Sequence, residues 1–220
     1  MSNLYTLFCF GSIALAIFAA GFLLGYAIRT NYRFRLVLNQ NRGEASVRNL
    51  IVSNFGPPDF HLLNNITIPF QDGTTQIDHI LISTKGIFVI ETKNYSGWIF
   101  ANEKSKQWIQ VIFRMKNQFQ NPLRQNYKHV KAIRELLEFL PKEQIHSIVV
   151  FSGKAVFKSP IPKDVFYLNQ LVSHLNTFKE DIISENRLQF CVGRLECKRF
   201  EATKKTDLHH QAYITKKFGS

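Results

Sequence analysis

Two apolar runs separated by a turn signal constrain this chain more than any other feature of its sequence. Gln76–Ser83 and Gly86–Asn94 are rich in isoleucine, valine and phenylalanine, which favour β-strands. Between them, the segment Thr84-Lys85-Gly86 suits a tight turn. The two runs are therefore predicted to form an antiparallel hairpin.

Three charged side chains interrupt the apolar hairpin near its open end. Because side chains alternate along a strand, Glu91 and Lys93 point to the same face. Pairing about the turn places Asp78 opposite residues 91–93, where paired Cβ atoms are roughly 4.5–5.5 Å apart. We therefore expect Asp78 and Glu91 to converge on one point, with Lys93 beside them.

These residue types suit phosphodiester hydrolysis. Two carboxylates in an apolar hairpin repel each other and are costly to bury, and a hard divalent cation removes that cost. Mg²⁺ (or Mn²⁺) is the expected ion, with Asp78 and Glu91 as its ligands. The ion can activate water and stabilise charge on a phosphate, and the Lys93 ammonium can orient the water or neutralise the developing charge. The alternative is a plain surface salt bridge between Glu91 and Lys93.

The remaining pattern predicts an α/β domain around a mixed sheet. Asn121 and Pro122 suit the cap and first residue of a helix with apolar residues at spacings of three and four. The apolar run Ile145–Phe151 is typical of a central strand covered on both faces. The other expected elements are helices over 43–55 and 169–183, a strand over 60–69, and short strands near 98–101 and 108–113.

The helix after Asn121 carries further candidate residues. Gln125 and His129 are four apart and share a face. We expect Gln125 to contact substrate or order the active site, and interpret His129 as ordinary helix polarity. Arg124, Lys128 and Lys131 form a basic stripe that can bind nucleic-acid phosphates, with a solvated helix face as the equally open alternative.

Four other residues are expected to have structural roles. Tyr95, Trp98 and Trp108 can stack on bases, but packing in the core or on a sheet face is the commoner role for such aromatic residues. His79 alternates with Asp78, so it is expected to pack or hydrogen-bond on the opposite side of the strand.

The N-terminus holds an uncharged apolar segment, Leu4–Ile28. A helix of that length spans a ~30 Å hydrocarbon core. A cleaved signal peptide is the alternative, but its apolar stretch is only about 7–15 residues and follows a positively charged start, which is missing here. Arg29, Arg33 and Arg35 come after the segment, so the positive-inside rule predicts an external N-terminus and a cytoplasmic domain.

Charge and cysteine content narrow the class of protein. The formal net charge of +12 points to an anionic partner, either nucleic acid or an anionic membrane face, with a plain solvated basic surface as the equally open alternative. Three cysteines, one of them in the apolar segment, do not fit a four-ligand zinc site or a disulfide-rich scaffold. The predicted organisation is a transmembrane anchor at 1–28, a basic juxtamembrane linker at 29–42, a catalytic domain at 43–190 and a basic extension at 191–220.

With these residues in this order, the sequence resembles the nuclease-related domain family, a branch of the PD-(D/E)xK superfamily. The resemblance covers about residues 40–155. Its most specific part is Gly86–Tyr95, which reads G-I-F-V-I-E-T-K-N-Y. The other matching pieces are Gly43-Glu44, Ile77–His79, Gly97, Trp108, and the pattern of Asn121, Pro122, Gln125 and His129. Ile77 stands where the family pattern has proline, which is not a metal ligand.

The resemblance implies a restriction-endonuclease-like mixed central sheet flanked by helices, here preceded by the transmembrane helix. It implies Mg²⁺-dependent cleavage of DNA, catalytic roles for Asp78, Glu91 and Lys93, and a supporting carboxylate at Glu44. From the residues alone, Glu44 fits equally well as a favourable charge at a helix N-terminus. A membrane-tethered nucleic-acid-binding module without activity and a scaffold beside the membrane are the competing functions. The oligomeric state is left open.

Overall fold

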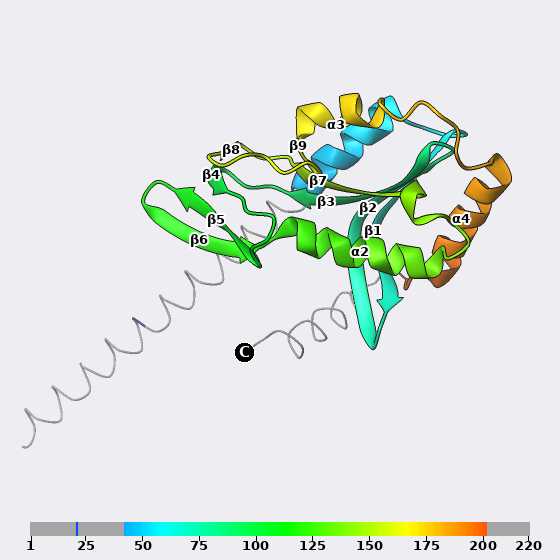
Figure 1. Cartoon of the computed structure of the whole chain (residues 1–220), viewed down its shortest axis with the longest axis horizontal. Coiled ribbons are helices and arrows are strands. Elements are labelled where there is room, and N and C mark those ends of the chain that lie inside the picture. The colour runs from blue at the N-terminus through cyan, green and yellow to red at the C-terminus, as the bar shows by residue number, and fades with distance from the viewer. Residues whose placement is uncertain (1–20, 22–41, 202–220) are drawn as a thin grey trace, which may run out of the picture. The chain divides into compact units, whose positions relative to one another are not determined.

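The computed structural model describes Gly21 and residues 42–201 and shows a mixed α/β arrangement (Figure 1). Residues 42–54 are helical. The elements that follow are β1 (Phe60–Phe70), β2 (Gly73–Ser83), β3 (Gly86–Lys93), β4 (Gly97–Phe100), β5 (Gln107–Ile112), β6 (Met115–Gln120), α2 (Pro122–Leu136), a 3₁₀ turn (Lys142–Gln144), β7 (Ile145–Phe151), β8 (Ala155–Phe157), β9 (Val165–Tyr167), α3 (Leu168–Leu175) and α4 (Glu185–Lys198).

The main sheet has five strands in the order β1-β2-β3-β7-β9. β1, β2 and β3 are antiparallel neighbours, whereas β3, β7 and β9 run parallel. The predicted hairpin is therefore confirmed, and so is the apolar central strand, β7. A parallel pair needs a long crossover connection, and the segment from β4 through α2 supplies it between β3 and β7.

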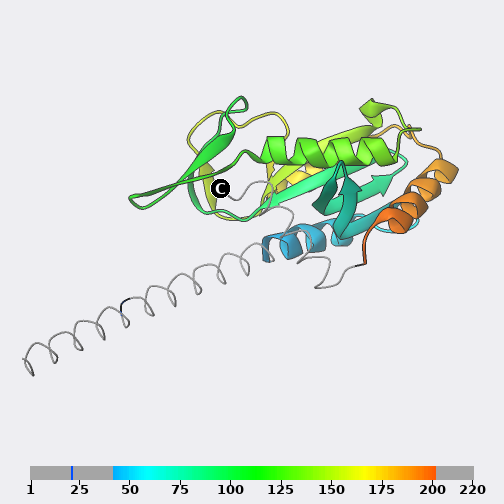
Figure 2. The same cartoon turned by 90° about the horizontal axis from the view of Figure 1, so that it is seen from below.

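Helices cover both faces of this sheet (Figures 1 and 2). α2 and α4 pack on one face, where Ile133 and Leu195 meet Ile80 and Val89. On the other face, the helix at residues 42–54 and α3 pack against a second apolar cluster of the same strands. The mixed central sheet flanked by helices that we predicted is thus present. Because α2 lies directly on β3, its inward side chains reach the strand that ends in Glu91 and Lys93.

A second sheet, not predicted as such, has the order β6-β5-β4-β8. The strands expected near 98–101 and 108–113 are its β4 and β5. β6 reads M-K-N-Q-F-Q, which lacks the apolar alternation that indicates a strand. The inner side of this sheet packs Ile99 and Trp108 against Phe151 at the end of β7, so the second sheet begins where the main strands end.

The helix predicted over 169–183 is wrong in length. α3 ends at Leu175, where the Thr177 hydroxyl donates to the carbonyl of His174. The backbone N–H groups of Ile182 and Ile183 then bind the carbonyl of Thr84 in the hairpin turn. These contacts join the segment between α3 and α4 to the hairpin turn. The predicted domain ends at residue 190, in the middle of α4. Cys191 and Leu195 of this helix are buried, so residues beyond 190 also contribute to the core.

The predicted anchor at Leu4–Ile28 and linker at 29–42 lie outside the described residues, apart from Gly21 and Arg42. In the part of the chain that the structure describes, no helix is both long and apolar enough to cross a membrane.

Candidate active site

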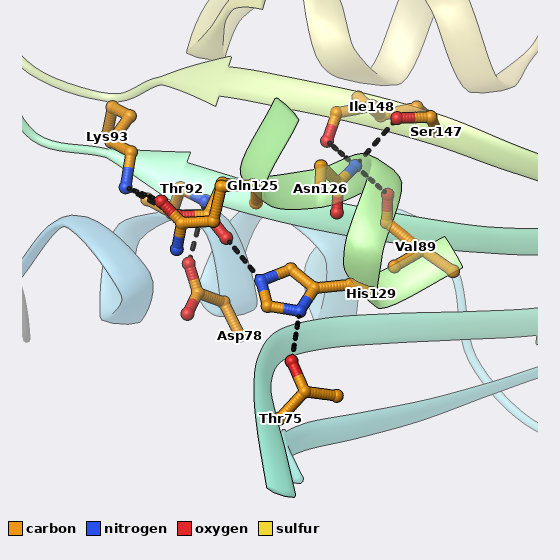
Figure 3. Close-up of polar contacts among 11 residues, drawn as sticks. Thr75, Asp78, Val89, Thr92, Lys93, Gln125, Asn126, His129, Ser147 and Ile148 are labelled. Carbon is orange, nitrogen blue, oxygen red and sulfur yellow. Dashed lines mark hydrogen bonds and ion pairs between the residues drawn. The ribbon is translucent and has the colours of Figure 1, made fainter. Parts of the chain in front are cut away.

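The hairpin brings Asp78 opposite Glu91, as expected. Regular pairing of β2 with β3 ends at His79 opposite Ile90, and Asp78 and Glu91 are the next residues on the two strands. Beyond this point a side chain links the two strands in place of a backbone pair. Oδ2 of Asp78 accepts a hydrogen bond of 2.8 Å from the backbone N–H of Thr92 (Figure 3). Asp78 is thereby held against the end of β3.

An irregularity in β1 coincides with Asp78. Leu63 and Ile66 are three residues apart, yet both pack in the core beneath α2. Regular alternation would place them on opposite faces. Asn65 between them has a φ of 50°, in the left-handed region, and the ladder skips the pair that would join it to Asp78. The side of β1 that faces the core therefore switches beside the candidate site.

Glu91 is the most enclosed of the predicted catalytic residues, with 1 % of its surface exposed. Its Oε1 lies 2.5 Å from the Lys93 ammonium, and its Oε2 lies 3.2 Å from Nε2 of His129. Lys93 also donates to Oε1 of Gln125 at 3.0 Å. The structure therefore joins Gln125 to the Glu91–Lys93 pair, as expected for a residue that orders the site.

The interpretation of His129 as ordinary helix polarity is wrong. Its ring is buried between α2 and the sheet, and its Nδ1 lies 2.8 Å from the hydroxyl of Thr75. Thr75, His129 and Glu91 thus form a continuous hydrogen-bonded chain (Figure 3). The spacing of Gln125 and His129 correctly predicted that they share one face of the helix. Spacing alone does not predict that this face packs against the sheet.

Asn126 was missed by the sequence reasoning. It is fully buried, and its amide nitrogen lies 2.9 Å from the carbonyl oxygen of Val89, 2.9 Å from the hydroxyl of Ser147 and 3.1 Å from the carbonyl oxygen of Ile148. It therefore fixes α2 to β3 and β7 beside Gln125 (Figure 3). The available signal was an amide four residues before Val130, on the apolar face of the predicted helix.

Glu44 reaches the site from the opposite layer. The helix at residues 42–54 approaches the end of β3 closely at Gly43, where an added Cβ would lie 2.5 Å from Cβ of Asn94 and 2.7 Å from Oγ of Ser152. No larger residue fits unless these neighbours move. The next residue, Glu44, is close enough to Asp78 for its charge to affect that carboxyl.

The electrostatics of the two candidate metal ligands differ. Burial raises the pKa of Asp78 well above its usual value, and the charges of Glu91 and Glu44 raise it further. Burial also disfavours ionisation of Glu91, but the Lys93 ammonium and the His129 hydrogen bond outweigh it and lower the pKa of Glu91 to about 2. Glu91 is therefore ionised at neutral pH, whereas at Asp78 the lowering effect of the Lys93 charge does not outweigh burial and the two acidic neighbours.

Lys93 remains an ammonium in this setting. Burial disfavours its charge, yet the carboxylates of Glu91 and Asp78 raise its pKa above the usual value. Lys93 is therefore suited to act as a cation and hydrogen-bond donor rather than as a base.

The donor set fits a hard divalent cation. Asp78 is a carboxyl that burial and two acidic neighbours make costly to ionise, and a bound cation would remove that cost. Within residues 42–201 there is no group of three or more His, Cys, Asp or Glu side chains arranged as a ready metal cluster. One or two carboxylates, completed by water and phosphate oxygens, is the set that Mg²⁺ commonly uses.

The predicted phosphate-binding stripe lies on the solvent side of α2. The Arg124 guanidinium donates to the carbonyl of Lys104 at 2.9 Å. Lys131 lies 3.9 Å from the Glu135 carboxylate. Lys128 is exposed between them. The stripe remains a prediction, because these contacts fit either a phosphate contact or a solvated helix face.

His79 and the aromatic residues take distinct positions. His79 is buried and lies 2.8 Å from Oδ1 of Asn64, as expected for a packed residue. Burial lowers the pKa of His79 to about 4. Trp108 is buried, and the Tyr95 ring packs edge-on against an aromatic neighbour. Trp98 instead is half exposed on β4.

Comparison with known proteins identifies a family and a curated relative of the chain. The family model described as "Nuclease-related domain" matches residues 39–152. An uncharacterized protein of Bacillus anthracis is 39 % identical over 158 residues, which cover 67 % of this chain and 70 % of the relative. No solved structure matches the chain. The family match spans the strands and helices that hold Asp78, Glu91, Lys93, Gln125 and His129.

Proposed function

The chain belongs to the nuclease-related domain family, of the restriction-endonuclease-like type, and on that premise we propose that it is a divalent-metal-dependent nuclease that cleaves DNA. One observation carries the proposal. Asp78, with its raised pKa, lies opposite Glu91 at the open end of the hairpin, with the Lys93 ammonium 2.5 Å from Glu91. This places two carboxyl groups and one cation together, an arrangement that suits metal-assisted phosphodiester hydrolysis.

Asp78 and Glu91 would hold the ion, with Glu44 as a supporting carboxylate. A bound Mg²⁺ or Mn²⁺ supplies Lewis acidity toward a phosphate oxygen and lowers the pKa of bound water. The chain orients both ligands beforehand. The Thr92 N–H fixes Asp78, and His129 with Lys93 fixes the two oxygens of Glu91.

Lys93 contributes charge toward the substrate. Two of its three N–H donors face Glu91 and Gln125, which leaves one for a phosphate oxygen or for the attacking water. Its raised pKa keeps it protonated through the neutral range. A positioned ammonium of this kind stabilises the negative charge that develops on the phosphate during the reaction. The basic residues Arg124, Lys128 and Lys131 would hold the flanking phosphates.

We also propose that residues 4–28 anchor the protein in the membrane, with the N-terminus outside and the nuclease domain in the cytoplasm. The support is the uncharged apolar segment followed by Arg29, Arg33 and Arg35.

A cleavage assay tests the activity. The full chain is incubated with supercoiled, linear and single-stranded DNA in Mg²⁺, Mn²⁺ or EDTA, beside Asp78→Asn and Glu91→Gln. These substitutions keep the shape of the side chains and remove their charge. We expect metal-dependent cutting that falls by at least about 100-fold in either variant. Absence of cutting by the unaltered chain, together with salt-sensitive DNA binding that survives both substitutions, would instead identify a tethered binding module.

A further inference from the structure

The outer side of the second sheet carries exposed aromatic residues. Ile99 of β4 points into the core, so alternation directs Trp98 and Phe100 outward. Trp98 is 50 % exposed and Phe100 is 40 % exposed. Large aromatic groups on a solvent-facing sheet often mark a contact surface.

Strand register assembles these residues into one surface. Trp98 pairs with Val111 of β5 and with Val156 of β8, and Phe100 pairs with Ile109. Val156 is also largely exposed, at 47 %. Paired residues share a face of the sheet, so the aromatic rings lie among apolar side chains that support them from both neighbouring strands. We call Trp98, Phe100 and their paired neighbours the aromatic face.

Two lysine side chains lie on or beside the aromatic face. Lys116 of β6 pairs with Val111 and is exposed. The Lys158 ammonium lies 4.8 Å from the centre of the Trp98 ring, in a cation–π contact. Across residues 97–120 and 153–160 there are six basic residues (Lys104, Lys106, Arg114, Lys116, Lys154 and Lys158) and a single acidic one, Glu103. A polyanion complements this surface, whereas a second copy of the same basic chain would be repelled.

The strand that carries Trp98 and Phe100 follows closely after the candidate catalytic residues in the chain. β3 ends at Lys93 and β4 begins at Gly97, so three residues separate them. The Gly97 N–H also binds the carbonyl of Lys154 beside β8, which fixes the start of β4. The β5–β6 hairpin extends the sheet away from the end of the domain that holds α4 (Figures 1 and 2).

We propose that the aromatic face binds unpaired bases of the nucleic-acid substrate, which stack on Trp98 and Phe100 while Lys116 and Lys158 contact the adjoining phosphates. The identity of this partner rests on the proposed nuclease function. Aromatic side chains on a basic sheet suit single strands, because every unpaired base offers a flat surface. In a duplex those surfaces are already stacked on their neighbours.

Tryptophan fluorescence of the full chain measures the contact directly. The chain has two tryptophans, and Trp108 is 1 % exposed, so a base that stacks on the sheet quenches Trp98. The titration uses oligothymidylate in EDTA, where no cleavage occurs. We expect saturable quenching by oligothymidylate and little by a blunt duplex of equal length. Trp98→Phe should remove the quenching and keep most of the affinity.

Affinity measurements complete the test. Trp98→Ala and Phe100→Ala should each weaken oligothymidylate binding by at least about tenfold. Phe190→Ala on α4 is the matched control, because Phe190 is also exposed but lies outside the second sheet, and it should leave affinity unchanged. Equal affinities in all of these variants would overturn the proposal. So would a Trp98 signal that responds to vesicles containing phosphatidylserine and not to oligothymidylate.

The results separate this inference from the proposed catalytic function. Metal-dependent cleavage by the unaltered chain with unchanged binding in Trp98→Ala contradicts the aromatic face alone. Quenching and Trp98-dependent binding without any cleavage support the aromatic face and contradict the enzyme. Glu91→Gln, which removes a candidate metal ligand and leaves the second sheet intact, should keep the quenching of Trp98 by oligothymidylate in EDTA.

Discussion

At the scale of single residues, Asp78 is where folding and the proposed chemistry conflict. Its carboxyl is placed against the end of β3 by the Thr92 N–H, yet burial and the charges of Glu91 and Glu44 raise its pKa. The pKa of Glu91 is instead lowered, since the neighbouring Lys93 and His129 stabilise its charged form. The site therefore has one carboxylate that the protein satisfies by itself and one that benefits from a bound cation.

This difference predicts how stability depends on pH without metal. Because the folded-state pKa of Asp78 is raised, its ionisation removes stability as pH rises from its usual value of 3.8 through the raised value. Because the folded-state pKa of Glu91 is lowered from 4.5 to about 2, its stabilising contribution is present above 4.5 and is lost as pH falls toward 2. At neutral pH, then, Asp78 opposes folding and Glu91 supports it.

Asp78→Asn should consequently stabilise the metal-free protein at neutral pH. The amide oxygen can still accept the Thr92 N–H, while the unfavourable charge is gone. We expect a Tm higher by about 2–4 °C for each kcal/mol recovered, and no further rise when Mg²⁺ is added. The unaltered chain should be stabilised by Mg²⁺. Thermal denaturation in EDTA and in Mg²⁺ measures both effects, with exposed Asp59→Asn as the control. A lower Tm for Asp78→Asn in EDTA would contradict this account.

At the scale of secondary-structure elements, α2 determines the geometry of the site. It carries Gln125 and His129 on its sheet-facing side, and Asn126 joins it to β3 and β7. Asn121 caps the helix by accepting the Leu123 N–H, as the sequence predicted. The cap determines where the helix begins, and Asn126 determines how it lies on the sheet.

Asn126→Ala should therefore impair the site through the helix. It removes the amide whose two N–H donors face the carbonyls of Val89 and Ile148 and the Ser147 hydroxyl, at a cost on the order of 3 kcal/mol in the free energy of unfolding. DNA cleavage should fall even at a temperature where the variant is fully folded, because Gln125 and His129 lose their alignment. Denaturant titration and cleavage rates measure the two effects, and exposed Asn117→Ala is the control. Full cleavage by the folded Asn126→Ala variant would contradict the role assigned to α2.

Some secondary-structure elements could be predicted from the sequence and others could not. The hairpin, the start of α2 and the strand β7 were predictable because local periodicity, turn residues and caps specify them. β6 and β8 were missed, since a short or polar strand acquires its structure from the neighbour with which it pairs. The end of α3 depends on contacts of Ile182 and Ile183 with the hairpin turn, which no local pattern shows.

At the scale of the whole molecule, some residues of the candidate site could be predicted from the sequence and others could not. Asp78, Glu91 and Lys93 were predictable from strand alternation within one hairpin. Asn126 and the structural role of Gly43 were not, because each depends on packing between segments that are distant in sequence. The burial of the His129 ring against the sheet was not predictable for the same reason. Side chains that perform the proposed chemistry are thus specified locally, while those that position them are specified by the assembled fold.

The proposed membrane anchor is the last prediction, and it concerns the chain as a whole. Leu15→Arg combined with Phe18→Arg puts two charges in the middle of the apolar segment, at a cost of about 2.5–3.5 kcal/mol each for insertion. We expect the unaltered chain to stay with membranes after alkaline carbonate extraction and the double variant to be released. Val37→Arg, outside the segment, should stay with the membranes.

DNA cleavage in detergent solution should be equal in these three proteins, because the substitutions lie far along the chain from Asp78 and Glu91. Orientation is tested on intact cells, where an external protease should leave the domain uncut until the cells are lysed. Release of the unaltered chain by carbonate would contradict the anchor, and cleavage of the domain in intact cells would contradict its cytoplasmic placement. Neither result would bear on the nuclease proposal, since the proposed catalytic residues all lie within residues 42–201.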